Sequence, residues 1–188
     1  MQGYRISASR RGEETMDQDT TKRESTLAGL FDVLLKRLLH ETLSAYGQDL
    51  TSLVVFGSVG RGTPTAGSDI DILLIAKELP DGRMSRVRQF DQVERALEPD
   101  LAEARTRGLT TRLSPIFRTE AEMALGGLIF LDMVNDSRIL FDRDSFFAAF
   151  LQRLQARLSE MGSIRVRRGG AWYWVLKPDL KPGEVFEI

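Results

Sequence analysis

Apolar side chains recur at steps of three and four residues after position 25, and this spacing predicts an amphipathic helix. The positions are Leu27, Leu30, Phe31, Leu34, Leu35, Leu38, Leu39 and Leu43. Ser25 or Thr26 is placed to cap the helix, and Gly47 to end it. A second stripe predicts another helix that ends near Glu98, because Pro99 follows. That stripe is Met84, Val87, Phe90, Val93 and Leu97.

Continuous apolar runs rich in β-branched residues predict buried strands over 50–56 (LTSLVVF) and 70–76 (IDILLIA). A third strand is expected over 109–117 (LTTRLSPIF). Pro115 removes one backbone donor from this run, which favours an edge strand or a bulge. The order along the chain is helix, strand, loop, strand, helix and strand, followed by helices, which is the pattern of an α/β or α+β domain.

The C-terminal part repeats these signals on a smaller scale. Thr119 and Glu122 have the spacing of a capping box, and a short strand is expected over 138–141. Asp144 is then placed to cap a helix that contains three phenylalanines and three leucines. Two short strands around Gly169-Gly170, at 164–168 and 172–176, predict a β-hairpin.

These elements divide the chain into three expected parts: residues 1–24, 25–142 and 143–188. The first part carries five basic and five acidic side chains and almost no large aliphatic residue, so we expect a mobile arm. The second part is the main domain. The third part contains a helix, a hairpin and a tail.

Composition excludes several classes of function. The 188 residues include 26 basic and 27 acidic side chains, so no whole-chain charge favours nucleic acid or a membrane surface. There is no cysteine and His40 is the single histidine, which excludes disulfides and thiolate sites and nearly excludes zinc. Every apolar window is interrupted well before about 18–20 residues, so we expect no membrane span. The polar start predicts no signal peptide, and a cytoplasmic location is expected.

One basic cluster leaves a nucleic-acid partner open. It consists of Arg153, Arg157, Arg165, Arg167 and Arg168. Such a cluster suits RNA or an acidic partner, although a solvated basic face is the commoner explanation.

The segment 54–75 (VVFGSVGRGTPTAGSDIDILLI) carries the candidate chemistry. Gly57, Gly60 and a third glycine at position 62 permit positive φ and close backbone approach, so amide groups and the Ser58 hydroxyl can face a phosphate. Arg61 adds a charged donor. A glycine-rich turn alone is a weak signal, because turns use these residues for conformational reasons.

Two aspartates, Asp69 and Asp71, strengthen the interpretation. Residues two apart on a strand point to one face, roughly 6.5–7 Å apart, so both carboxylates can serve one site. Asp71 lies between Ile70 and Ile72, where an unpaired carboxylate is costly. Magnesium bound by carboxylate oxygens would compensate it. The alternative is that Asp69 only caps the loop and that Asp71 forms a structural ion pair with an arginine of a neighbouring helix.

The arrangement Gly57-Ser58, ten residues, then Asp69-x-Asp71 resembles the signature of the DNA polymerase β nucleotidyltransferase superfamily, and is most similar to its minimal nucleotidyltransferases, the MNT type. The resemblance implies a nucleotidyltransferase fold, a short mixed sheet with helices packed on one side. It also implies that Asp69 and Asp71 are catalytic and bind two Mg²⁺ ions. The nucleotide, ATP or another NTP, would be bound by a set that comprises Gly57, Ser58, Gly60, Arg61 and Ser68.

The resemblance further implies an activity: transfer of AMP from ATP to a hydroxyl of a partner protein or another acceptor, with release of pyrophosphate. Minimal members often accompany a HEPN-domain toxin as its antitoxin, so such a partner is expected. Two alternatives are a catalytically weak module that neutralises a partner by contact, and an enzyme that modifies small molecules such as aminoglycosides. The sequence leaves the base preference, the acceptor and the oligomeric state open.

The sequence departs from the family's pattern at one point. Active members usually place a third carboxylate on a following strand, where this chain has Ser114 and no acidic residue between Glu103 and Glu120. Three explanations are open: Glu120 or Glu122 reaches the site from the adjoining loop, the acceptor supplies a base, or catalysis is slow.

Overall fold

A mixed four-stranded sheet forms the centre of the molecule. The computed structural model describes residues 11–169, 171–181 and 183–186, with side chains described from Leu27 onward except that of Ala171. The strands lie in the order β3-β2-β1-β4, where β1 pairs antiparallel with β2 and β4, and β2 pairs parallel with β3. Their bounds are β1 Leu50–Phe56, β2 Ile70–Ala76, β3 Leu113–Thr119 and β4 Arg138–Asp142. The α/β class and the first two strands agree with the prediction.

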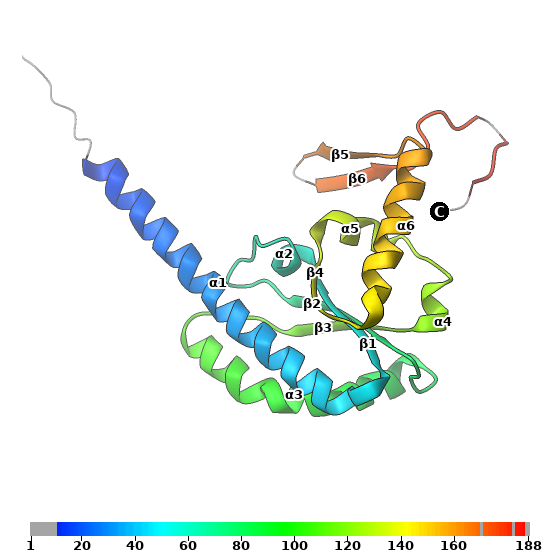
Figure 1. The fold of residues 1–188 in the computed structure, drawn as a ribbon. Helices are drawn as coiled ribbons and strands as arrows, with labels where there is room; N and C mark the ends of the chain where they lie inside the picture. Colours follow the sequence, from blue (N-terminus) through cyan, green and yellow to red (C-terminus); the bar gives the residue numbers. More distant parts are fainter. Residues whose placement is uncertain (1–10, 170, 182, 187–188) are drawn as a thin grey trace, which may run out of the picture.

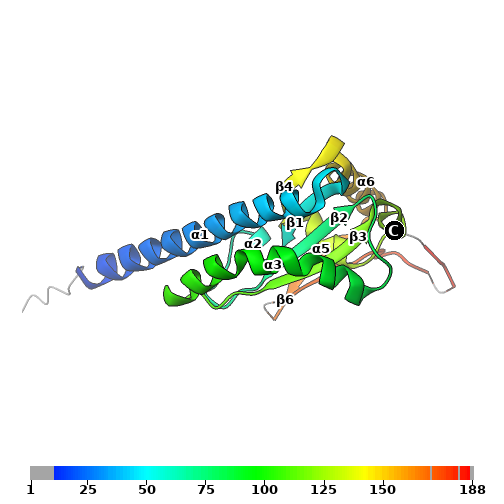
Figure 2. The ribbon, with the colours of Figure 1, turned by 90° about the horizontal axis from the view of Figure 1, so that it is seen from below.

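Two long helices cover one face of this sheet. α1 (Arg11–Tyr46) and α3 (Arg83–Thr106) lie side by side against it (Figures 1 and 2). Alternate residues of β2, such as Ile72 and Leu74, are fully buried against these helices. This core explains why the two apolar stripes predicted the helices: each stripe is the side that meets the sheet.

The opposite face is also covered. α5 (Ile129–Asp136) and α6 (Phe146–Glu160) pack over the remaining side chains of β1 and β2, Val54, Leu73 and Ile75. The sheet therefore has helices on both faces: α1 and α3 lie on one face, as predicted, and α5 and α6 lie on the other. The runs of β1 and β2 have no polar alternation because both of their faces are buried.

Both long helices extend beyond their predicted ends. α1 begins at Arg11 rather than at Ser25 or Thr26, and its first half projects away from the sheet (Figure 1). The expected arm is thus helical over residues 11–24, whereas residues 1–10 lie outside the described residues. α3 continues through Pro99, because Leu101 and Ala104 extend the buried stripe past it.

Two local predictions differ from the structure. β3 begins at Leu113, since 109–112 forms a loop in which Thr110 N donates to Ala66 O at 2.7 Å. Asp144 does not cap α6, because it lies in a 3₁₀ turn with φ 51°. The N-cap position is Ser145, and the first amides of α6 are satisfied by Asp142, whose carboxylate accepts from the amides of Phe147 and Ala148 at 2.9 and 3.0 Å.

The remaining local predictions are confirmed. Thr119 and Glu122 form a capping box at the start of α4 (Glu120–Met123), and Pro115 lies in the edge strand β3. β5 (Ile164–Arg168) and β6 (Ala171–Val175) form the predicted hairpin, a separate two-stranded sheet. Along the described part of the chain, no helix combines the length and the apolar character that crossing a membrane requires.

Candidate active site

The glycine turn and the two aspartates meet at one end of the β1–β2 pair. β1 runs directly into the short helix α2 (Gly57–Gly60), and Phe56 at the end of β1 pairs with Asp71 of β2. Gly57 has φ 68°, and a Cβ added there would lie 3.3 Å from Asp71 Cγ and closer still to Oδ2. The turn therefore touches the second carboxylate only because residue 57 has no side chain.

Gly60 is required for a different contact. A Cβ at this position would lie 2.5 Å from the carbonyl oxygen of Val55 and 2.8 Å from that of Asp136. The turn consequently packs tightly between β1 and the end of α5. The first four amides of a helix have no acceptor within it, so α2 offers donors beside Ser58.

Ser68 closes the other end of the loop. Its hydroxyl accepts a hydrogen bond from Thr65 N at 2.9 Å, and its amide donates to Thr65 O at 3.1 Å. These bonds fix the chain immediately before Asp69. The nucleotide contact predicted for Ser68 stays a prediction.

The Asp71 carboxylate is partly buried. Burial raises the pKa of Asp71, a hydrogen bond from the Ser114 hydroxyl opposes this shift, and the nearby charge of Asp69 adds to it. Ser114 lies directly beside Asp71 in the parallel β2–β3 register. Among the described residues no arginine pairs with Asp71, so the alternative of a structural ion pair finds no support in these contacts.

Asp69 pairs with an exposed arginine. Arg112 lies on the loop before β3, and its Nη2 is 3.2 Å from Asp69 Oδ2. The Arg112 side chain is 84% exposed, so solvent screens this pair and it contributes little to stability. The Asp69 carboxylate can therefore exchange this partner for a cation at low cost.

The third carboxylate is not supplied by Glu120 or Glu122, and that explanation is wrong. Both residues follow Thr119, which pairs with Ala76, whereas Asp71 lies five residues earlier on β2, roughly 16 Å away at about 3.3 Å per residue. Glu120 accepts a hydrogen bond from the Thr51 hydroxyl at 2.6 Å.

Glu122 is held at that distant end by Arg86, whose two terminal nitrogens each donate to its carboxylate at 2.7 Å. This bidentate pair holds the pKa of Glu122 at about 2. Within the residues that the structure describes, no three acidic or histidine side chains come together as metal ligands. The site thus has two carboxylates and a serine.

An ion triad around the buried Asp136 carboxylate joins the turn to the C-terminal hairpin, and it could not be found from the sequence. The Asp136 carboxylate at the end of α5 pairs with Arg61 at 3.0 Å and with Arg165 of β5. The Arg165 hydrogen bond lowers the pKa of Asp136, burial opposes this, and Arg61 lowers it further. Arg61, predicted to contact a nucleotide, has its guanidinium engaged in this triad.

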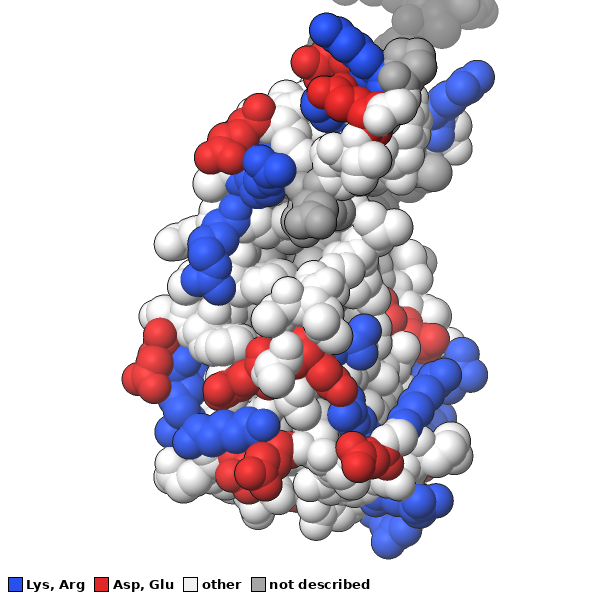
Figure 3. Space-filling model, turned by 90° about the vertical axis from the view of Figure 1, so that its right-hand side faces the viewer, with Lys and Arg blue, Asp and Glu red and all other residues white. Residues whose placement is uncertain are grey.

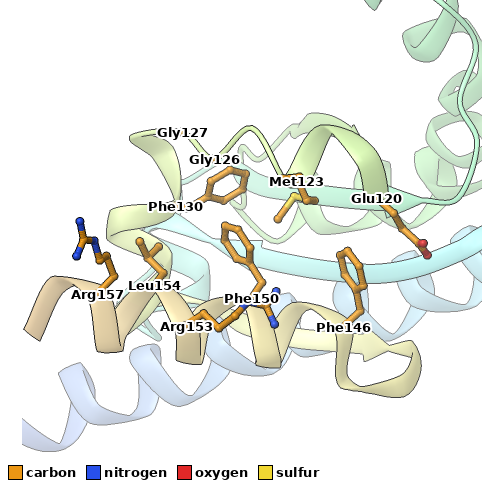
Figure 4. Close-up of a pocket in the computed structure, with 11 residues that line it drawn as sticks. Glu120, Met123, Gly126, Gly127, Phe130, Phe146, Phe150, Arg153, Leu154 and Arg157 are labelled. Atoms are coloured by element: carbon orange, nitrogen blue, oxygen red, sulfur yellow. The ribbon is translucent and has the colours of Figure 1, made fainter. Parts of the chain in front are cut away.

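A cavity of about 360 Å³ opens beside the triad and reaches the turn. It is lined by Phe56, Gly57, Arg61, Ile129, Asp132, Asp136, Arg165 and Trp172. A larger cavity of about 510 Å³ lies between the segment 123–130 and α6 (Figure 4). Its walls are mainly apolar, with Glu120 at one end and Arg157 at the other. Asp69 and Asp71 are not among the residues that line it.

The charges on the face drawn in Figure 3 alternate in sign, with an uncharged band between two mixed regions. Arg153 and Arg157 lie on α6, whereas Arg165 is committed to Asp136. The arginines that the sequence groups into one basic cluster therefore lie on different elements, and one of them is neutralised by a buried carboxylate.

Comparison with known proteins shows what the central part of the chain is similar to. Residues 35–123 match the family model described as nucleotidyltransferase domain. A protein of Methanocaldococcus jannaschii, named "Putative protein adenylyltransferase MJ1305", is 28% identical over 141 residues, which cover 74% of this chain and 90% of the relative.

Two solved structures give distant likenesses. A toxin-antitoxin crystallised with AMP-PNP has a TM-score of 0.39 at 17% identity, covering 72% of this chain and 92% of that chain. A mutant of the toxin-antitoxin MntA-HpeT has a TM-score of 0.40 at 16% identity, covering 74% and 92%.

Proposed function

We propose that the protein transfers AMP from ATP to a hydroxyl group of a partner protein, because residues 35–123 are similar to the nucleotidyltransferase domain family. The chain is a transferase of nucleotidyl groups. The choice of a protein acceptor is supported by the name of the archaeal relative, which aligns along 90% of its own length.

One observation carries the proposal: the Asp71 carboxylate lies directly against Gly57 at the start of the turn. Carboxylates that bind a cation and amides that bind phosphate are thereby brought to one place. A nucleoside triphosphate needs both, because its phosphates are anionic and are commonly bound together with a divalent cation.

The donor set fits magnesium. Asp71 is a partly desolvated carboxylate whose described contacts include no basic side chain, and Asp69 lies next to it with only an exposed arginine. Magnesium is usually bound by one or two carboxylates together with substrate phosphates and water, so Asp69 and Asp71 would hold it here. When bound, the ion supplies neutralisation of the charge that develops as pyrophosphate departs.

The residues of the chain orient the reactants. The amides of Gly57, Ser58 and Gly60 bind the β- and γ-phosphates, and Ser68 keeps the loop closed before Asp69. The acceptor oxygen forms a bond to the α-phosphorus while the bond to the pyrophosphate oxygen breaks. Ser114 is no base for the acceptor proton, so a group on the acceptor or solvent takes it, and intrinsic transfer is slow.

A HEPN-domain partner and a cytoplasmic location stay predictions from the family resemblance. The identity of the partner depends on the genomic neighbour of this protein. Co-expression with that neighbour tests the partner, because a true acceptor is isolated with AMP attached and gains the corresponding mass.

The test of the proposed activity uses ATP labelled at the α-phosphate, MgCl₂ and the neighbouring gene product. We expect label on the partner with the wild-type chain and none with Asp69→Ala or Asp71→Ala. Glu78→Ala, an exposed acidic residue just after β2, is the matched control and retains transfer. Absence of label with the wild-type chain at every divalent cation tried would refute the proposal.

Ser114 in place of the third carboxylate favours one second candidate, a module that neutralises its partner by contact. The same aspartate variants separate the two functions. Neutralisation that survives both substitutions, without any transfer of label, would establish contact alone.

A further inference from the structure

The C-terminal hairpin is fixed beside the phosphate turn. Arg165 of β5 shares the buried Asp136 carboxylate with Arg61, which directly follows α2. On β6, Trp174 Nε1 donates to Asp132 at 3.4 Å. The hairpin is thus anchored through both of its strands to α5, and its position relative to the turn is defined (Figure 1).

Trp172 presents an aromatic surface to the cavity between the hairpin and the turn. Trp172 is 48% exposed although it lines the same cavity as Gly57. The guanidinium carbons of Arg165 and Arg167 lie 4.8 and 5.8 Å from its ring centre. These cation–π contacts orient the ring without burying it.

The chemistry of the cavity favours a planar, uncharged group over a second anion. Its two guanidinium groups, on Arg61 and Arg165, are already paired with Asp136. Asp132 adds a further negative charge. The remaining walls, Phe56 and Ile129, are apolar. A phosphate would find both guanidinium groups already neutralised by Asp136, whereas an aromatic ring would bury apolar surface against the walls.

We propose that this cavity is the nucleobase subsite: the base of the nucleotide stacks on Trp172 while its phosphates lie on the Gly57–Gly60 turn. This inference rests on the proposed function. Gly57 belongs to both the turn and the cavity wall, so one nucleotide reaches both. A cavity of about 360 Å³ lies within the range of small-molecule sites.

The experiment compares two ligands that differ in the base. ATP and inorganic tripolyphosphate, each with MgCl₂, are titrated by calorimetry into the full chain and into Trp172→Ala, Trp172→Phe and Tyr173→Ala. Tyr173 is the matched control: it is an exposed aromatic residue on the same strand but projects to the opposite face of the hairpin.

Loss of base stacking has a defined signature. Trp172→Ala raises the Kd for ATP about 5- to 100-fold and leaves that for tripolyphosphate unchanged. Trp172→Phe restores most of the ATP affinity, and Tyr173→Ala stays within about twofold of the wild type. Recovery by phenylalanine shows that the alanine variant did not simply unfold the hairpin.

Each other result has one meaning. Equal ATP affinity of Trp172→Ala and the wild type overturns the subsite, even if the acceptor then binds more weakly, because Trp172 would be an acceptor contact. Equal losses for ATP and tripolyphosphate also overturn it, since the hairpin would then act on the turn alone. A wild-type chain that binds neither ligand refutes the proposed function itself.

Discussion

The contact between Gly57 and Asp71 gives the sharpest prediction, the effect of Gly57→Ala. Alanine at φ 68° costs about 1–2 kcal/mol, because its Cβ crowds the following carbonyl in the left-handed region. For a domain of this size each kcal/mol lowers Tm by about 2–4 °C, so a fall of roughly 2–8 °C is expected. The stability effect alone is modest.

The effect on activity is much larger. The new Cβ would lie 3.3 Å from Asp71 Cγ, and it overlaps Oδ2, so the carboxylate must move away from the turn. A displacement of about 1 Å in an active site costs on the order of 100-fold in rate. We therefore expect Mg²⁺-dependent transfer to fall at least about 100-fold, measured with α-labelled ATP at saturating magnesium.

Gly47→Ala is the control for backbone strain. Gly47 has φ 53°, and a Cβ there would meet nothing within 4 Å. This variant should lose a similar amount of stability, measured by thermal denaturation, and keep its activity. If Gly57→Ala retains transfer within tenfold of Gly47→Ala, the reasoning about a shared site is refuted.

Three further predictions concern the ion triad, Ser114 and the Arg86–Glu122 pair. Asp136→Ala leaves Arg61 and Arg165 without their shared buried partner and should cost about 1.5–3 kcal/mol, a value reduced because the Arg61 side chain is 41% exposed and Arg165 retains Asp132 at 3.8 Å. The expected fall in Tm is roughly 3–12 °C, and a fall under 2 °C would contradict the triad. Ser114→Asp restores a third carboxylate beside Asp71 and should raise the transfer rate at least about tenfold over Ser114→Asn; equal rates would assign the base to the acceptor. Glu122→Gln should cost about 1–2 kcal/mol at pH 7, a value reduced for the exposure of a third of the Glu122 side chain. Because the folded pKa of about 2 lies below the ordinary 4.5, this contribution is complete above pH 4.5 and is lost as pH falls towards 2, so urea titrations of the two proteins must converge there.

Features encoded by neighbouring residues could be predicted from the sequence. The apolar runs of β1 and β2, the capping box of Thr119 and Glu122, and the C-terminal hairpin all depend on short-range spacing. The meeting of Gly57 and Asp71 was also predictable, because the turn and the aspartates lie at one end of two consecutive strands.

Features that depend on distant partners could not be predicted. The triad joins Asp136 to an arginine 29 residues later, and Glu120 is held by a threonine 69 residues earlier. Neither partner is visible from local spacing. Pro99 misled the prediction because tertiary burial of Leu101 and Ala104 outweighs the local preference of proline to end a helix.

The antiparallel pairing of β1 and β2 has a consequence for the order in which the chain assembles. The turn and both aspartates lie within one hairpin whose outermost pair is Leu50 and Ala76, so it closes from local contacts. Ser114 joins Asp71 only through a parallel pairing 43 positions away, after the crossover helix α3 has packed. Closure entropy rises with loop length, so the hairpin that holds the turn and both aspartates closes at a lower entropic cost than the β2–β3 pairing that brings Ser114 beside Asp71.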